Sequence, residues 1–555
     1  MSVRNALVLF LALSTMSLLV GCGSSGPKAV APPTGGFTTS SLNGTYVFSF
    51  SGTDVFSSNL AASASYFSVV GALTASSGAL TGTIDVIDPE LGEALNISPV
   101  LTAQTLTGGS YSITPDGRGS GTIRISPNGT NIEFGLDFVL MTPSHGLITR
   151  FDPNGTGSGT IDLQDSTLTQ SALTSYAFSL SGVDGTIVNP FVTAGAFTLG
   201  GTSTISTGLQ DINDDNNSTT NLPLTGSLTL GAAGSAGAAL LTATDSPYGT
   251  LSFDVWPIDA THMKLIEVDG AEYIEGDAFT QQATISSGQL VYTMAGLDAA
   301  NDSVLSSGGF LTYTAPTTIA NGYEDINDGG SIGSSLTVSG SLTATGGGRY
   351  QLVLGGLYNS AVGAGTYYFA AYPTANGGIL LMEDDNAGVT AGTAFFQTAQ
   401  TFASAQGYGL NLTGQNSDGE VDDIAEFTAT SGTVQNCSSG GTLSEGIIDE
   451  NDEGTTGFRL PLGPNGSYCF DSTGSGRGEL LYPDTGTLIG TLTLDFYVAN
   501  SSTVLFIDAD SEAQTGVGTF QLQNASASSP ALANTQSHAS ALKAAAVARA
   551  RRRQK

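Results

Sequence analysis

Four stretches of this chain follow the same pattern, and this repeat constrains the fold more than any other feature. Each copy opens with a strand-like segment that ends in glycine: Tyr46–Gly52, Tyr176–Gly182, Leu290–Gly296 and Tyr408–Gly414. An acidic turn, G-x-x-D-x-[NI]-D, follows downstream in Gly82–Asp88, Gly208–Asp214, Gly322–Asp328 and Gly446–Asp452. Each copy closes on a strand ending in Gln164, Gln282, Gln397 or Gln523. A unit of about 115 residues has the size of a domain and is too long for a solenoid repeat.

Each unit contains about eight short segments in which apolar and polar residues alternate, separated by turns of Gly, Asn, Asp and Ser. In the first segment, Tyr46, Phe48 and Phe50 share one face, because successive side chains of a strand point to opposite sides. Inside the units no long segment has helical periodicity, so the sheets are expected to be antiparallel. The predicted fold is all-β: four tandem antiparallel domains, as up-and-down, calycin-like barrels in preference to sandwiches.

The repeat also predicts the domain boundaries. We expect a leader at 1–21, a flexible tether at 22–40, β-domains at 41–168, 169–285, 286–400 and 401–524, and a disordered Ala/Ser-rich tail with a basic end at 525–555. Aromatic residues at inward positions favour filled barrels: Phe134, Phe138, Tyr367, Phe369 and Phe496. Each domain is expected to fold on its own, with Tyr176–Ser181 paired to Asp277–Gln281 and with Ser179 exposed.

The N-terminal residues form an export signal. Arg4 precedes an apolar run from Ala6 to Val20, which is too short to be a typical membrane span. The run ends in Leu19-Val20-Gly21-Cys22, which resembles the lipobox of bacterial lipoproteins. This resemblance implies that Cys22 carries the lipid after the leader is cleaved. Gly23 follows it in place of Asp, which by the same resemblance implies the outer membrane.

The four units together resemble the Gly/Ser/Thr-rich tandem-repeat lipoproteins predicted for soil bacteria. No known activity comes with that resemblance.

The composition of the chain limits the kinds of partner that it can bind. The chain has 48 acidic and 15 basic residues and a net charge of −33, so nucleic acid is excluded as a partner. The expected partners are the membrane, through the N-terminal lipid, and an unidentified envelope or extracellular protein.

Two further cysteines, Cys437 and Cys469, lie in the fourth unit. In an exported protein they are expected to form a disulfide. Two buried thiols and a metal-binding pair are the alternatives.

The acidic turns suggest either a cation site or a structural turn. Carboxylate and amide oxygens suit Ca²⁺, and the candidate ligands are Asp211, Asn213, Asp214, Asp325, Asn327, Asp328, Asp449, Asn451 and Asp452. The loops lack the full EF-hand pattern, and Asp and Asn are also common in hairpin turns because they bond to their own backbone. In the first copy Ile87 replaces the Asn. We favour the structural turn over the Ca²⁺ site. Apart from the Ca²⁺ of that alternative, we expect no cofactor.

The sequence contains no HExxH motif and no nucleophile motif near its three histidines. We therefore expect a non-catalytic structural or interaction role in the cell envelope. One alternative is a binding protein that holds a small apolar or carbohydrate ligand inside its barrels. A second alternative is an envelope hydrolase that uses a carboxylate pair such as Asp384 and Asp385.

Overall fold

The computed structural model describes ten ranges of the chain: 36–54, 65–186, 189–199, 202–359, 363–417, 419–435, 437–462, 465–482, 491–510 and 514–526. The leader, Cys22, most of the expected tether and the basic tail lie outside these ranges. None of the helices within them is long and apolar enough to cross a membrane.

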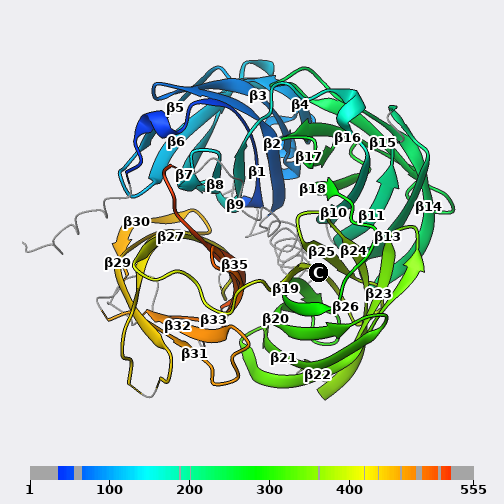
Figure 1. The fold of residues 1–555 in the computed structure, drawn as a ribbon. Helices are drawn as coiled ribbons and strands as arrows, with labels where there is room; N and C mark the ends of the chain where they lie inside the picture. Colours follow the sequence, from blue (N-terminus) through cyan, green and yellow to red (C-terminus); the bar gives the residue numbers. More distant parts are fainter. Residues whose placement is uncertain are drawn as a thin grey trace, which may run out of the picture. The chain divides into compact units, whose positions relative to one another are not determined.

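The described strands form four closed antiparallel barrels of eight strands each, which confirms the predicted fold class (Figure 1). Barrel 1 contains β1 (Gly44–Asp54), β2 (Ser65–Ser76), β3 (Ala79–Ile87), β4 (Val100–Thr105), β5 (Gly108–Ile113), β6 (Arg118–Ile125), β7 (Ile132–Thr142), β8 (His145–Asp152) and β9 (Gly155–Leu163), with helix α2 (Pro89–Leu95) and the 3-10 turns η1 (Thr39–Ser41) and η2 (Pro127–Gly129). Barrel 2 contains β10 (Ser175–Asp184), β11 (Pro190–Thr198), β12 (Thr204–Ile205), β13 (Thr207–Asp214), β14 (Asn217–Thr229), β15 (Gly237–Ala243), β16 (Thr250–Pro257), β17 (His262–Glu267) and β18 (Glu272–Thr280), preceded by η3 (Gln170–Ala172).

Barrel 3 contains β19 (Gly288–Asp298), β20 (Ser303–Thr314), β21 (Thr318–Asp328), β22 (Ser331–Gly346), β23 (Arg349–Asn359), β24 (Gly363–Pro373), β25 (Gly378–Glu383) and β26 (Gly388–Phe396). Barrel 4 contains β27 (Gln406–Gln415), β28 (Glu420–Ser431), β29 (Gly440–Asp452), β30 (Thr455–Pro461), β31 (Ser467–Phe470), β32 (Arg477–Tyr482), β33 (Leu492–Asn500), β34 (Thr503–Asp508) and β35 (Thr515–Leu522). The short strands β4, β12 and β30 lie beside the eight-stranded rings of barrels 1, 2 and 4.

Each barrel closes between its first and last long strands, as the repeat predicts. In barrel 2, β10 pairs with β18 in antiparallel register, from Tyr176 opposite Thr280 to Asp184 opposite Glu272. Barrels 1, 3 and 4 close in the same way, through β1 with β9, β19 with β26, and β27 with β35. Each first strand therefore has a partner on both sides, and none of them is an open edge.

The interiors of the barrels are filled by their own side chains. Of the five aromatic residues expected to point inward, Phe134, Phe138, Phe369 and Phe496 are buried, and Tyr367 packs against the core of barrel 3. Tyr46, Phe48 and Phe50 of the opening strand β1 also lie in the core of barrel 1, as the alternating pattern predicts. Phe37, which belongs to the expected tether, is also buried in the core of barrel 1.

The outer faces of the opening strands are buried as well, and here the sequence-based expectation was wrong. Ser179 was expected to be exposed, but only 1% of its surface is accessible. The reason is that neighbouring barrels pack against each other. One apolar cluster joins barrels 2 and 3 through Ala177 and Tyr372, and another joins barrels 4 and 1 through Ile424 and Val139.

Candidate functional site

The acidic turns lie where one barrel meets the next. In barrel 2, β13 and β14 are joined by a two-residue hairpin turn in which Asp215 and Asn216 have φ angles of 50° and 67°. Such turns need positive φ, which Asp, Asn and Gly adopt at low cost. Gly329 and Gly330 occupy the equivalent positions in barrel 3, with φ angles of 55° and 91°. The local sequence therefore forms a tight turn that directs the preceding Asp and Asn toward the neighbouring barrel. We call each such set of inter-barrel contacts a joint.

The joint between barrels 2 and 3 is centred on Asp211. Its Oδ2 accepts a hydrogen bond from Arg349 Nε at 2.7 Å and another from the hydroxyl of Tyr372. Its Oδ1 accepts from the backbone N–H of Asn221 at 2.6 Å. Arg349 is 1% exposed and also pairs with Asp384. This carboxylate is thus held by donors from its own barrel and from the next one.

Asn213 completes this joint. Its Nδ2 donates to the backbone carbonyls of Glu383 and Gly388, both at 2.9 Å. These carbonyls lie where β25 ends and β26 begins, so one side-chain amide bridges both sides of a hairpin in barrel 3. The Asp and the Asn of the repeat therefore bind two different features of the next barrel.

The joint between barrels 3 and 4 repeats this arrangement. Asp325 Oδ2 accepts from Arg477 Nε at 2.6 Å and also from Tyr497. Asn327 Nδ2 donates to two carbonyls, of Asp508 and Gln514, at 3.0 and 2.6 Å.

The joint between barrels 4 and 1 closes the cycle of contacts. Arg118 Nη1 donates to Asp449 Oδ2 at 3.0 Å. Asn451 Nδ2 donates to the carbonyls of Arg150 and Gly155 at 3.0 and 2.8 Å. Each barrel thus contacts the next one in sequence, and the fourth contacts the first.

The joint between barrels 1 and 2 uses different chemistry. Asp85 Oδ2 accepts from the indole Nε1 of Trp256 at 2.6 Å. Ile87, at the position of the Asn, packs in an apolar cluster with the same Trp256. This joint therefore replaces the Arg and Asn contacts with an aromatic one.

The closing glutamines also contact the next barrel. The side-chain amide of Gln164 donates to the carbonyl of Pro257 at 2.7 Å, and that of Gln523 donates to the carbonyl of Leu140 at 3.1 Å. In barrel 2 the equivalent residue is Gln281, and not Gln282 as the sequence suggested. The register decides this, because the backbone N–H of Gln281 donates to Ser175, the first residue of β10.

The second Asp of each candidate cation site is bonded within its own barrel. Asp214 accepts from the hydroxyl of Tyr248 at 2.6 Å, Asp328 from Asn301, and Asp452 from Asn416. In the described part of the chain, no group of three or more His, Cys, Asp or Glu side chains could hold a metal ion. The hydrogen bonds described above show that these residues hold the hairpins and the joints together.

Three arginines of the joints were missed by the sequence analysis: Arg118, Arg349 and Arg477. Each is the first residue of its strand, β6, β23 or β32. Basic residues are rare in this chain, so an Arg at the same place in three copies could have indicated a shared partner for the acidic turns.

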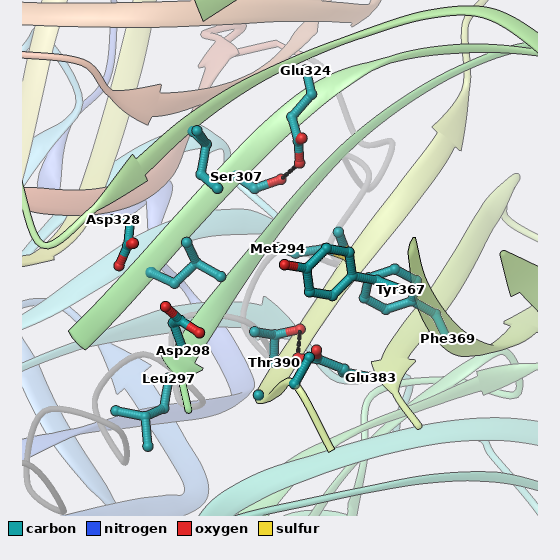
Figure 2. A pocket seen from close by; sticks show the side chains of 14 residues that line it. Met294, Leu297, Asp298, Ser307, Glu324, Asp328, Tyr367, Phe369, Glu383 and Thr390 are labelled. Carbon is teal, nitrogen blue, oxygen red and sulfur yellow. Dashed lines mark hydrogen bonds between the residues drawn. The ribbon is translucent and has the colours of Figure 1, made fainter. Parts of the chain in front are cut away.

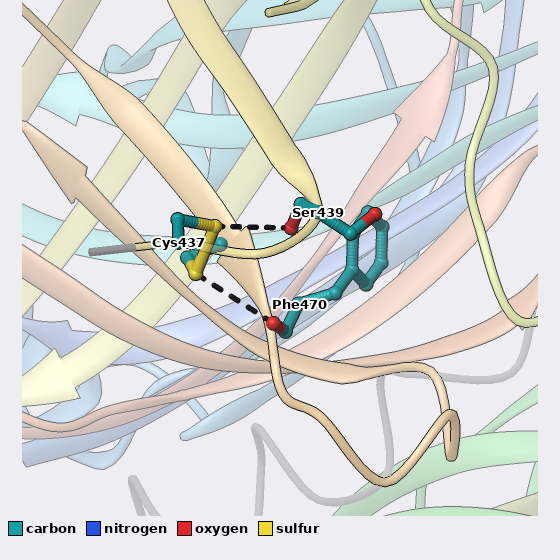
Figure 3. The surroundings of a disulfide bond; sticks show 4 residues. Cys437, Ser439 and Phe470 are labelled. Carbon is teal, nitrogen blue, oxygen red and sulfur yellow. Dashed lines mark hydrogen bonds between the residues drawn. A yellow bond between two sulfur atoms is a disulfide. The ribbon is translucent and has the colours of Figure 1, made fainter. Parts of the chain in front are cut away.

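The predicted disulfide is confirmed. Cys437 and Cys469 are bonded, with their Cα atoms 5.7 Å apart. The bridge ties the segment before β29 to β31 in barrel 4, next to Ser439 and Phe470 (Figure 3). It is an addition of the fourth unit, because the other three units have no cysteines.

A small cavity lies at one end of barrel 3, lined by apolar residues and carboxyl groups. The hydroxyl of Ser307 donates to Glu324 at 2.7 Å, and that of Thr390 donates to Glu383 at 3.0 Å. Figure 2 marks both hydrogen bonds. Burial raises the pKa of Glu383 well above its ordinary value, and the nearby Asp385 raises it further. The cavity measures about 40 Å³, which suits a few water molecules and is too small for a sugar.

The carboxylate pair considered for hydrolysis is bonded to protein groups. Asp384 accepts from Arg349 and from Gln351, and Asp385 accepts from the backbone N–H groups of Tyr368 and Ala387, both at 2.7 Å. Both side chains therefore hold local structure.

Several buried carboxyl groups near the joints have raised pKa values. Burial, helped by the nearby Asp449, raises the pKa of Asp137 from 3.8 to about 8, although Arg118 opposes the shift. Burial likewise raises the pKa of Glu426 to about 9, with a further contribution from Asp116. At neutral pH these carboxyl groups hold a proton, which reduces the cost of burying them.

Comparison with known proteins gives little. No family model and no curated protein matches this chain. Among solved structures, a single-site mutant of transferrin binding protein B, a vaccine antigen of Haemophilus parasuis Hp5, is 10% identical, and the match covers 68% of this chain and 83% of that chain. The intact Ap-TbpB, with N and C lobes, is 11% identical over 68% and 84%, and CghA with Sch210972 is 10% identical over 63% and 89%. Their TM-scores are all 0.16, so these likenesses support no inference.

We predict that Asn213→Ala lowers the free energy of unfolding by about 2 kcal/mol, because it leaves two buried carbonyls without a donor. Urea denaturation of the whole protein measures this. The matched control is Asn217→Ala in the same hairpin, where the side chain is exposed and the expected loss is below about 0.5 kcal/mol. Equal losses in the two variants would contradict the role of Asn213 in the joint.

A second prediction concerns pH. Because the pKa of Asp137 is raised in the folded state, the folded protein keeps a proton that the unfolded chain releases. The resulting stabilisation is complete at low pH and is lost as the pH rises from about 4 through about 8. The thermal unfolding midpoint should therefore fall less steeply between pH 4.5 and 8.5 in Asp137→Asn than in the unmodified protein. Parallel profiles would show that this carboxyl is ionised in the folded state.

Proposed function

We propose that this chain is a lipid-anchored, non-catalytic protein of the bacterial cell envelope, in which four barrels act together as one structural or interaction body. The observation that carries the proposal is the use of the repeated polar residues. The Asp, Asn and Gln that recur in the copies, the residues one would first consider for chemistry, bond neighbouring barrels to each other.

The filled barrel interiors support the same proposal. A site for a small molecule usually has a volume of about 300 to 1,000 Å³. The four cores consist of packed apolar and aromatic side chains, and the cavity at the end of barrel 3 is far smaller than that range. A ligand enclosed within a barrel, the first alternative considered from the sequence, has no support from this packing.

The anchor is proposed from the sequence alone, since Cys22 lies outside the described residues. The lipobox-like Leu19–Cys22 predicts acylation, and several acyl chains on one residue hold a protein stably on a bilayer. The resemblance to sorting signals assigns the protein to the outer membrane. The membrane is then one partner, and an envelope or extracellular protein that docks on the outside of the barrels is the other.

The anchor can be tested in a Gram-negative host that expresses the whole chain. Metabolic labelling with a radioactive or clickable fatty acid should mark the protein, and Cys22→Ala should abolish the mark and release the protein from the membrane fraction. The control is the double variant Cys437→Ala/Cys469→Ala, which should keep the label. Labelling that survives Cys22→Ala would refute the lipid anchor.

A further inference from the structure

Both ends of the described chain meet at one turn of barrel 1, the turn between β5 and β6. The backbone N–H of Phe37 donates to the carbonyl of Pro115 at 3.2 Å. From the other end of the described chain, the side-chain amide of Gln523 donates to the carbonyl of Asp116 at 2.7 Å. The segment before Phe37 and the segment after Gln523 therefore leave barrel 1 at the same place, which we call the exit point.

Further contacts join the two ends at the exit point. Phe37 is buried in the core of barrel 1, and Ala525 packs against the same core. A methyl group added to Gly36 would lie 3.8 Å from the Cβ of Ala525. The backbone N–H of Asn524 donates to the carbonyl of Met141 at 2.6 Å. The two ends are thus neighbours in space, although almost the whole chain separates them in sequence.

The segment that follows Ser526 ends in a basic cluster, residues 543–555, which we call the basic segment. No acidic residue occurs from position 513 to position 555. The basic residues of the cluster are Lys543, Arg549, Arg551, Arg552, Arg553 and Lys555. The basic segment is therefore the part of this acidic chain where positive charge gathers.

The basic side chains of the barrels are already committed to partners within the protein. The following residues form ion pairs with carboxylates: Arg118, Arg124, Arg150, Lys264, Arg349 and Arg477. With a net charge of −33, the chain as a whole is repelled by an anionic surface. An attraction to phosphate groups must therefore come from the basic segment.

The predicted lipid and the basic segment are connected to the exit point by stretches of similar length. Cys22 lies about 14 residues before Gly36 and Lys543 about 17 residues after Ser526, and a chain spans at most about 3.6 Å per residue. Each can therefore lie at most about 50 to 60 Å from the exit point. One membrane surface can meet both at once.

We propose that residues 543–555 bind the anionic phosphate headgroups of the membrane that holds the acylated Cys22. The proposal rests on the proposed function for the identity of that membrane. Lys and Arg clusters are attracted to anionic headgroups, and an acyl anchor combined with a polybasic segment holds a protein more firmly than either does alone. The contact offsets the repulsion between the acidic barrels and the headgroups.

The acidic barrels are the competing partner within the chain. Much of their charge is already neutralised. Asp211, Asp325 and Asp449 are paired with arginines, and Asp137 and Glu426 hold a proton at neutral pH because burial raises their pKa values. A headgroup layer presents a continuous surface of phosphates instead, so the membrane is the favoured partner.

Vesicle cosedimentation at pH 7 tests the proposal with the whole mature chain, expressed from Gly23 onward so that it carries neither leader nor lipid. Vesicles of phosphatidylcholine with about one third phosphatidylglycerol should bind the protein about tenfold more tightly, or better, than vesicles of phosphatidylcholine alone. The difference should disappear in about 1 M salt, where the Debye length is about 3 Å. Equal binding to the two kinds of vesicle, or binding to neither, would overturn the proposal.

Two matched double variants locate the contact. Arg552→Gln/Arg553→Gln should weaken binding to the anionic vesicles about tenfold. Arg124→Gln/Arg459→Gln removes the same charge from exposed arginines of barrels 1 and 4 and should leave binding unchanged. Equal losses in the two variants would show that the overall charge determines binding, and would refute the assignment to the basic segment.

This test is independent of the test of the lipid anchor. The vesicle assay uses protein that lacks Cys22, so an error about the anchor leaves its result unchanged. Conversely, Arg552→Gln/Arg553→Gln in the exported chain should keep the fatty-acid label, so a failure of the basic segment to bind leaves the anchor standing.

Discussion

The structure depends on one interaction: side chains of one barrel inserted among backbone carbonyls and arginines of the next. A closed barrel has no free edge, so two barrels cannot be joined by extending a sheet between them. Side chains must supply the contact instead. The amide of Asn213 bridges both sides of a hairpin, while Asp211 binds Arg349. Directional bonds of this kind fix the orientation of one barrel on the next, because a small rotation would leave buried polar groups unpaired.

Charged groups are buried in three of the four joints. Each ion pair of a joint buries charge, and an unpaired buried charge is very costly. In three joints an Arg is matched to the Asp, and in the fourth the indole of Trp256 replaces it. Other buried carboxyl groups, such as Asp137 and Glu426, remain protonated at neutral pH because burial raises their pKa values. The stability that these two groups contribute is therefore lost as the pH rises through about 8 for Asp137 and about 9 for Glu426.

The sequence predicted the barrels because their determinants are local. Alternation placed Tyr176 and Phe178 in the core, and turn residues placed the hairpins. The sequence did not predict the joints, because Asp and Asn fit an ordinary hairpin turn equally well. The partner residues are also remote in sequence, since Arg118 and Asp449 are 331 positions apart. For the same reason Ser179 was expected in solvent.

The central claim is that barrel 4 docks on barrel 1, and cross-linking tests it directly. The hydroxyls of Ser158 in β9 and Thr413 in β27 share a buried hydrogen bond. Cysteines at both positions, on the background that lacks Cys22, should therefore form an intramolecular disulfide, seen as a faster band on a non-reducing gel that reductant reverses. Each variant that carries only one of the two introduced cysteines should lack this band. A double variant that stays reduced, or that forms only dimers, would contradict the closed cycle of joints.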